Sequence, residues 1–98
     1  MRKIIKGNVT IIMNKKDYYS IKEKTILIAK NTHPDLVIVK NRIEAIVTEM
    51  DNKLCHAAII AREFKIPLLM GIKNATKRFK TNDKVIIDLK NKSIFKIK

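Results

Sequence analysis

The sequence predicts an α/β fold formed by one domain that spans residues 1–98. In the middle of the chain, short runs rich in β-branched residues alternate with helix-like segments, which is typical of βαβ units. Towards the C-terminus two such runs follow each other across a short turn, which indicates antiparallel pairing. The length of 98 residues and mass of 11.4 kDa allow one modest core and no second lobe.

Four elements are expected in the first half of the chain. Residues 9–13 read as a strand after Gly7, and residues 25–29 and 43–48 read as buried strands, because each is short, apolar and β-branched. Pro34 suits the first position of a short helix or turn over residues 34–40.

A helix over residues 55–65 is the main element of the second half. Its apolar residues recur at helical spacing, so that one face packs on a sheet: Ala57, Ile60, Ala61 and Phe64. Arg62 and Lys65 are then expected to face outward. A short strand over residues 67–70 ends at Gly71, residues 74–79 form a helical turn, and residues 85–88 and 93–97 form a hairpin that turns at residues 91–92.

His56 lies in the first turn of the predicted helix, directly after a strand and a polar loop. The backbone N–H groups at a helix start have no partner within the helix, and the helix dipole favours an anion there. Ala57 and Ala58 carry small side chains, so a substrate phosphate could approach the imidazole and these amides closely. The arrangement suits phosphorylation of His56.

The motif around His56 resembles the swivelling phosphohistidine domain of phosphoenolpyruvate-utilising enzymes, most closely that of phosphoenolpyruvate synthase and pyruvate phosphate dikinase. The resemblance rests on Thr48, the string Cys-His-Ala-Ala-Ile-Ile-Ala-Arg-Glu at residues 55–63, Ile-Pro at residues 66–67, and Gly71. It extends to Thr-Ile-Leu-Ile-Ala at residues 25–29, to Thr32 and Pro-Asp at residues 34–35, and to Ala-Thr at residues 75–76 with residues 83–88. Nearly the whole chain is covered.

The resemblance implies a layered β/β/α architecture and a catalytic role for His56. The histidine would accept a phosphoryl group from ATP or phosphoenolpyruvate and pass it to pyruvate or another acceptor. Thr48, Arg62 and the amides of Ala57 and Ala58 would stabilise the phosphate. The partners implied are nucleotide-binding and phosphoenolpyruvate- or pyruvate-binding domains or subunits. Mg²⁺ is expected with those partners, and no metal or cofactor is expected on this chain alone.

Two positions depart from the family pattern. The Gly-Gly pair that precedes the histidine is Asp51-Asn52 here, and the usual hydroxyl residue two before the histidine is Leu54. Asp and Asn tolerate a left-handed backbone better than most residues, but they hinder close backbone approach to a phosphate more than glycine does.

Several of these residues have structural alternatives. Thr48 could cap the end of its strand, and Arg62 could pair with Glu63 or a neighbouring loop, or meet the phosphoryl group or a partner domain. Cys55 is expected to be a small packing residue and His33 a turn residue. Two histidines and one cysteine at these spacings do not form a recognisable zinc site.

The strong positive charge raises a second hypothesis. The chain carries 22 Lys and Arg against 9 Asp and Glu, a net charge of +13, so an anionic partner such as nucleic acid must be considered. The lysines are scattered, and aromatic residues make up only 5% of the chain, which leaves few surfaces for stacking bases. The alternative function is a degenerate, non-catalytic binding or regulatory module that uses its basic surface for nucleic acid or an acidic protein.

The cellular location is expected to be the cytoplasm. The sequence has no apolar run long enough to cross a bilayer, its start lacks the pattern of a secretory signal, and its single cysteine agrees with a reducing compartment.

Overall fold

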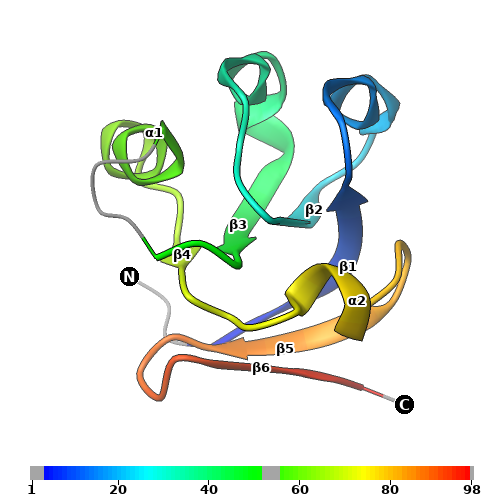
Figure 1. Cartoon of the computed structure of the whole chain (residues 1–98), viewed down its shortest axis with the longest axis vertical. Coiled ribbons are helices and arrows are strands. Elements are labelled where there is room, and N and C mark those ends of the chain that lie inside the picture. The colour runs from blue at the N-terminus through cyan, green and yellow to red at the C-terminus, as the bar shows by residue number, and fades with distance from the viewer. Residues whose placement is uncertain (1–3, 52–55, 98) are drawn as a thin grey trace.

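The computed structural model describes residues 4–51 and 56–97, and at His56 the backbone alone. In chain order the elements are β1 (Ile4–Ile12), η1 (Lys15–Ser20), β2 (Thr25–Ala29), η2 (Pro34–Arg42), β3 (Ile43–Thr48), α1 (His56–Phe64), β4 (Leu68–Leu69), α2 (Ala75–Arg78), β5 (Lys84–Asp88) and β6 (Ser93–Lys96). Figure 1 shows them in three layers, with η1, η2 and α1 on one side, β5 and β6 on the other, and the parallel strands between. This confirms the predicted layered α/β fold.

The middle layer consists of parallel strands in the order β4-β3-β2-β1. All five residues of β2 are buried, as expected of a parallel strand covered on both faces. Leu27 and Ile46 point towards the helices and pack with Tyr18 and Leu36, whereas Ile28 and Val47 belong to the core on the opposite face. Two hydrophobic cores therefore lie on the two sides of the parallel strands.

Strand β1 connects two layers. Residues 9–12 pair in parallel with β2, whereas residues 4–8 pair antiparallel with β5, which in turn pairs antiparallel with β6. The sheet curls at β1, so that β5, β6 and α2 cover the face of the parallel strands that the longer helices leave open (Figure 1).

Most of the predicted bounds differ from the structure by no more than two residues at an end, and two larger corrections are needed. β1 begins at Ile4 rather than residue 9, because Ile5 is fully buried and the first half of the strand pairs with β5, far away in the sequence. The short helix η1 was not predicted. Its local signal is a capping box, in which the Asn14 side chain accepts from the Lys16 N–H and the Asp17 carboxylate accepts from the Asn14 N–H.

No helix within the described residues is long and apolar enough to span a membrane.

Candidate functional site at the start of helix α1

His56 is the first residue of α1, at the edge of the molecule where the parallel strands end. β3 ends at Thr48, and the loop that leaves it leads into the helix. The His56 side chain and residues 52–55 lie outside the described part of the chain. The predictions made for Asn52, Leu54 and Cys55, and for the orientation of the imidazole, therefore remain predictions.

The inward face of α1 is the one that the sequence predicts. Ala57 is fully buried, and Ala58, Ile60 and Ala61 are nearly so, whereas Arg62 is exposed. This packing fixes the helix axis against the parallel strands. The contact of a phosphate with the backbone N–H groups of Ala57 and Ala58 stays a prediction.

Helix α1 ends in a left-handed residue. Lys65 has a φ of 57°, and the N–H of Ile66 donates to the carbonyl of Ala61 at 2.9 Å, the arrangement of a Schellman motif. Ile66 is buried beneath the helix end, which turns the chain into β4.

Thr48 is buried at the end of β3, with 1% of its surface exposed. Its hydroxyl donates to the carbonyl of Met50 at 2.8 Å, and its own carbonyl accepts from the N–H of Ile72 at 3.1 Å. These are the contacts of a strand-end cap. The phosphate-stabilising role of Thr48 stays a prediction, and in this structure the hydroxyl holds the loop that precedes the histidine.

The chain between β3 and Asp51 is held from both sides. The N–H of Glu49 donates to the carbonyl of Ala29 at 3.1 Å, and that of Met50 donates to Lys30 at 3.2 Å. On the other side the N–H of Gly71 donates to the carbonyl of Met50 at 3.3 Å. Residues 49 and 50 thus continue the path of β3, and backbone hydrogen bonds hold them in place on both sides.

Glu49 joins this loop to the start of α2. Its Oε2 atom accepts from the hydroxyl of Thr76 at 2.6 Å and from the Thr76 N–H at 2.8 Å. These hydrogen bonds favour the charged carboxylate and lower the pKa of Glu49, and Lys30 and Lys77 lower it further. Sequence reasoning missed this contact, because the two residues are 27 positions apart.

We expect Glu49→Gln to lower stability at neutral pH by about 1 kcal/mol, because hydrogen bonds to a charged acceptor are stronger than those to an amide. A lowered folded-state pKa contributes stability above the unfolded-state pKa of about 4.3, and the contribution is lost as the pH falls through the folded-state value. Urea unfolding at pH 7 and pH 3 should show the two proteins converging in acid. Glu23→Gln, at an exposed position, is the control. A difference that is the same at both pH values would contradict the assignment.

Gly71 allows the loop to pack closely. Its φ is 75°, and a Cβ atom there would lie 3.3 Å from both Cβ and Oδ2 of Asp51. The absence of a side chain at residue 71 therefore lets Asp51 lie directly against the chain that follows β4.

Gly71→Ala should lose about 1–2 kcal/mol of stability, because a non-glycine residue is strained in this left-handed region and the new methyl group contacts Asp51. Gly7→Ala is the matched control. A Cβ there would lie 3.2 Å from the flexible end of Ile26, and Gly7 is not among the residues with positive φ. Equal losses in the two variants, measured by urea unfolding, would show that backbone strain at residue 71 is not the cause.

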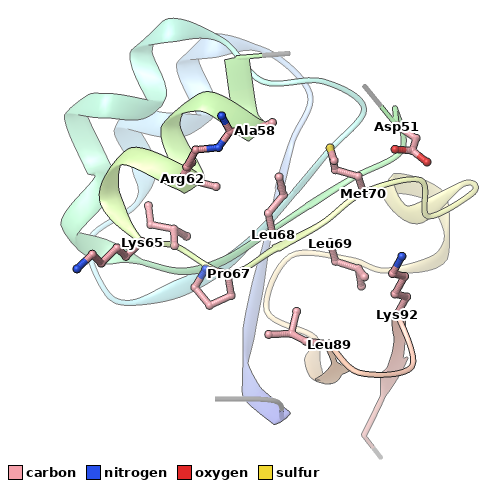
Figure 2. Close-up of a pocket in the computed structure, with 12 residues that line it drawn as sticks. Asp51, Ala58, Arg62, Lys65, Pro67, Leu68, Leu69, Met70, Leu89 and Lys92 are labelled. Carbon is pink, nitrogen blue, oxygen red and sulfur yellow. The ribbon is translucent and has the colours of Figure 1, made fainter. Parts of the chain in front are cut away.

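Arg62 lies almost two turns beyond His56, about 9 Å further along the helix axis at 1.5 Å per residue. It lines a hollow of about 920 Å³ that lies between α1, β4 and the turn before β6 (Figure 2). Among the described residues Arg62 makes no ion pair with Glu63. Its role towards a partner domain and its role towards the phosphoryl group both stay predictions.

His33 lies in the turn after β2, and β2 ends beside the end of β3, where Ala29 pairs with Thr48. Its Nδ1 accepts from the N–H of Asp35 at 3.1 Å, so His33 is the N-cap of η2, as a turn residue should be. Within residues 4–51 and 57–97 no group of three or more His, Cys, Asp or Glu side chains is arranged to hold a metal ion.

Comparisons of the sequence with protein families and with individual proteins point to the same family. The family described as "PEP-utilising enzyme, mobile domain" matches residues 21–92. The probable phosphoenolpyruvate synthase of Pyrococcus horikoshii is 39% identical over 82 residues, which is 84% of this chain and 10% of that protein. The phosphoenolpyruvate synthase of Pyrococcus furiosus is 40% identical over the same length and share. The chain thus spans about a tenth of the length of these relatives.

A solved structure shares the fold. The NMR solution structure of Enzyme I (nEIt) aligns with a TM-score of 0.63 and 27% sequence identity, over 76% of this chain and 31% of that chain.

Proposed function

We propose that this chain, which belongs to the mobile-domain family of PEP-utilising enzymes, carries a phosphoryl group on His56 between partner modules. The observation that supports this most is the position of His56 as the first residue of α1, within the family motif and beside the ends of the parallel strands. The helix start supplies N–H donors and the positive end of a dipole.

The chemistry is nucleophilic. A neutral imidazole nitrogen attacks the phosphorus atom of ATP or phosphoenolpyruvate, a phosphorus–nitrogen bond forms, and the phosphorus–oxygen bond to the leaving group breaks. The reverse attack, by an oxygen of pyruvate, phosphate or another acceptor, breaks the phosphorus–nitrogen bond and frees the imidazole. The ordinary histidine pKa of about 6.5 keeps the attacking nitrogen unprotonated near neutrality.

The remaining residues would stabilise the phosphate. The amides of Ala57 and Ala58 would donate to the phosphate oxygens, and Arg62 and Thr48 would add positive charge or a hydroxyl donor. Thr48 would have to exchange its hydrogen bond with Met50 to do so. The nucleotide-binding and phosphoenolpyruvate-binding modules, and the Mg²⁺ that phosphoryl transfer commonly uses, would come from outside these 98 residues.

The test is to incubate the chain with a phosphoenolpyruvate synthase whose own carrier histidine has been replaced, together with ³²P-labelled phosphoenolpyruvate. We expect label on this chain that is lost in acid and retained in base, as a phosphorus–nitrogen bond requires. Label that survives acid would indicate an oxygen ester and would overturn the proposal, and so would the absence of label when the same synthase labels an intact carrier domain added in its place.

A further inference from the structure

Strand β4 stands at the end of the six-stranded sheet, and the hollow of about 920 Å³ lies beside it (Figure 2). The volume is that of a ligand site for a drug-sized molecule or a few side chains.

The outer edge of β4 offers backbone groups for pairing. The N–H of Ile46 in β3 donates to the carbonyl of Pro67 at 2.9 Å. Since backbone groups alternate between the two sides of a strand, the N–H and C=O of Leu68 face away from β3. No strand in the described part of the chain lies on that side of β4. Leu68 therefore presents one donor and one acceptor to a further strand.

The walls of the hollow are mostly apolar and come from three elements. α1 contributes Ala58 and Ala61, the β4 segment contributes Leu68, Leu69 and Met70, and the turn after β5 contributes Leu89. Such walls favour apolar side chains that would otherwise stay in water.

The charged residues at the hollow are mostly cations. Among the described residues Arg62, Lys65 and Lys92 line it, against one carboxylate, that of Asp51. An occupant with apolar groups and more than one negative charge is therefore complementary to it. None of the lining residues within the described part of the chain is aromatic, so these walls lack the stacking surfaces with which proteins hold single-stranded nucleic acid.

From the free edge, the apolar walls and the charge we infer that this hollow binds an extended acidic segment of a partner polypeptide, which adds to β4 as a seventh strand. Apolar side chains of that segment enter the hollow, and its Asp or Glu residues meet the cations at the rim. The N–H and C=O groups of Leu68 form backbone hydrogen bonds with the added strand, and the cations Arg62, Lys65 and Lys92 favour a segment with negative charge. This inference concerns a partner surface and does not depend on phosphorylation of His56.

A peptide titration tests it directly. The probe is a seven-residue synthetic peptide in which Val alternates with Glu, added to ¹⁵N-labelled protein. We expect the amide signals of Leu68 and Leu69 to shift, and hydrogen exchange at Leu68 to slow. The same peptide with Lys in place of Glu, or with N-methylated amides that cannot pair with a strand, should bind at least tenfold more weakly.

Variants of the rim separate charge at the hollow from the overall charge of the chain. Lys65→Gln together with Lys92→Gln should lower the affinity for the Glu peptide about three- to tenfold, as expected for the loss of two exposed ion pairs. Lys24→Gln with Lys80→Gln removes the same charge at exposed positions outside the hollow and should leave affinity unchanged.

Four results would overturn the inference. They are equal affinity for the Lys peptide, signal changes centred away from β4, displacement of the peptide by a single-stranded oligonucleotide that shifts the same amides, and self-association of the protein through β4. His56→Ala should bind the peptide as the wild type does, so the outcome is distinct from that of the labelling experiment.

Discussion

His56→Ala should abolish acid-labile phosphorylation of the chain, with at least a thousandfold loss of labelling rate. No other side chain can supply the same phosphorus–nitrogen bond at this position, and removal of a covalent nucleophile leaves only binding and electrostatic effects. The measurement is the initial rate of ³²P incorporation from phosphoenolpyruvate, followed by acid and base treatment of the labelled chain.

The chain contains a matched control for this variant. It has two histidines, and His33 lies in the turn after β2, where its Nδ1 caps η2. His33→Ala removes the same functional group and should label at the rate of the wild type, with a small loss of stability from the missing cap. Label that persists in His56→Ala and disappears in His33→Ala would assign the chemistry to His33 and refute the proposed carrier histidine.

The same pair of variants addresses the alternative of a basic binding module. If the chain binds single-stranded DNA or RNA, its affinity should fall with salt because of the net charge of +13 and should be the same for both variants. Salt-dependent binding without any labelling of the wild type would favour that alternative over the carrier.

Strands and helices with strong local patterns were predictable from the sequence. β2 and β3 have the predicted bounds because both are short, largely apolar runs, and all their residues are buried except Glu44 of β3, which is half-buried. The inward face of α1 follows from the helical spacing of its apolar residues. In these elements local preference and tertiary packing agree.

Features that depend on distant residues were not predictable. The first half of β1 contains Gly7 and Asn8, which locally disfavour a strand, and it is held by pairing with residues 84–88. The contact between Glu49 and Thr76 likewise joins segments with no shared local pattern. The motif around His56 locates the candidate site, whereas the hydrogen bonds that hold the loop before it required the structure.

The largest effects on stability are expected in β2, where neighbouring residues serve the two cores. Leu27 and Ile28 are both fully buried, Leu27 against the helices and Ile28 against the layer of β5 and β6. Leu27→Ala and Ile28→Ala should each cost about 2–5 kcal/mol, from lost burial and from the cavity that remains. Since a small domain has only about 5–15 kcal/mol of stability, either variant removes a large part of it.

Ile38→Ala provides the control, because Ile38 in η2 is 61% exposed and its truncation should change stability by no more than about 0.5 kcal/mol. Urea unfolding, monitored by circular dichroism, measures the free energy of unfolding of the three variants. Two-state unfolding gives all three the same dependence of that free energy on urea concentration. A large loss in Leu27→Ala with none in Ile28→Ala would mean that β5 and β6 do not cover the parallel strands in solution. The core between the parallel strands and β5 and β6 would then not form as described, and the packing of the segment after β4, whose N–H groups donate to the carbonyls of Thr48 and Met50, would be lost with it.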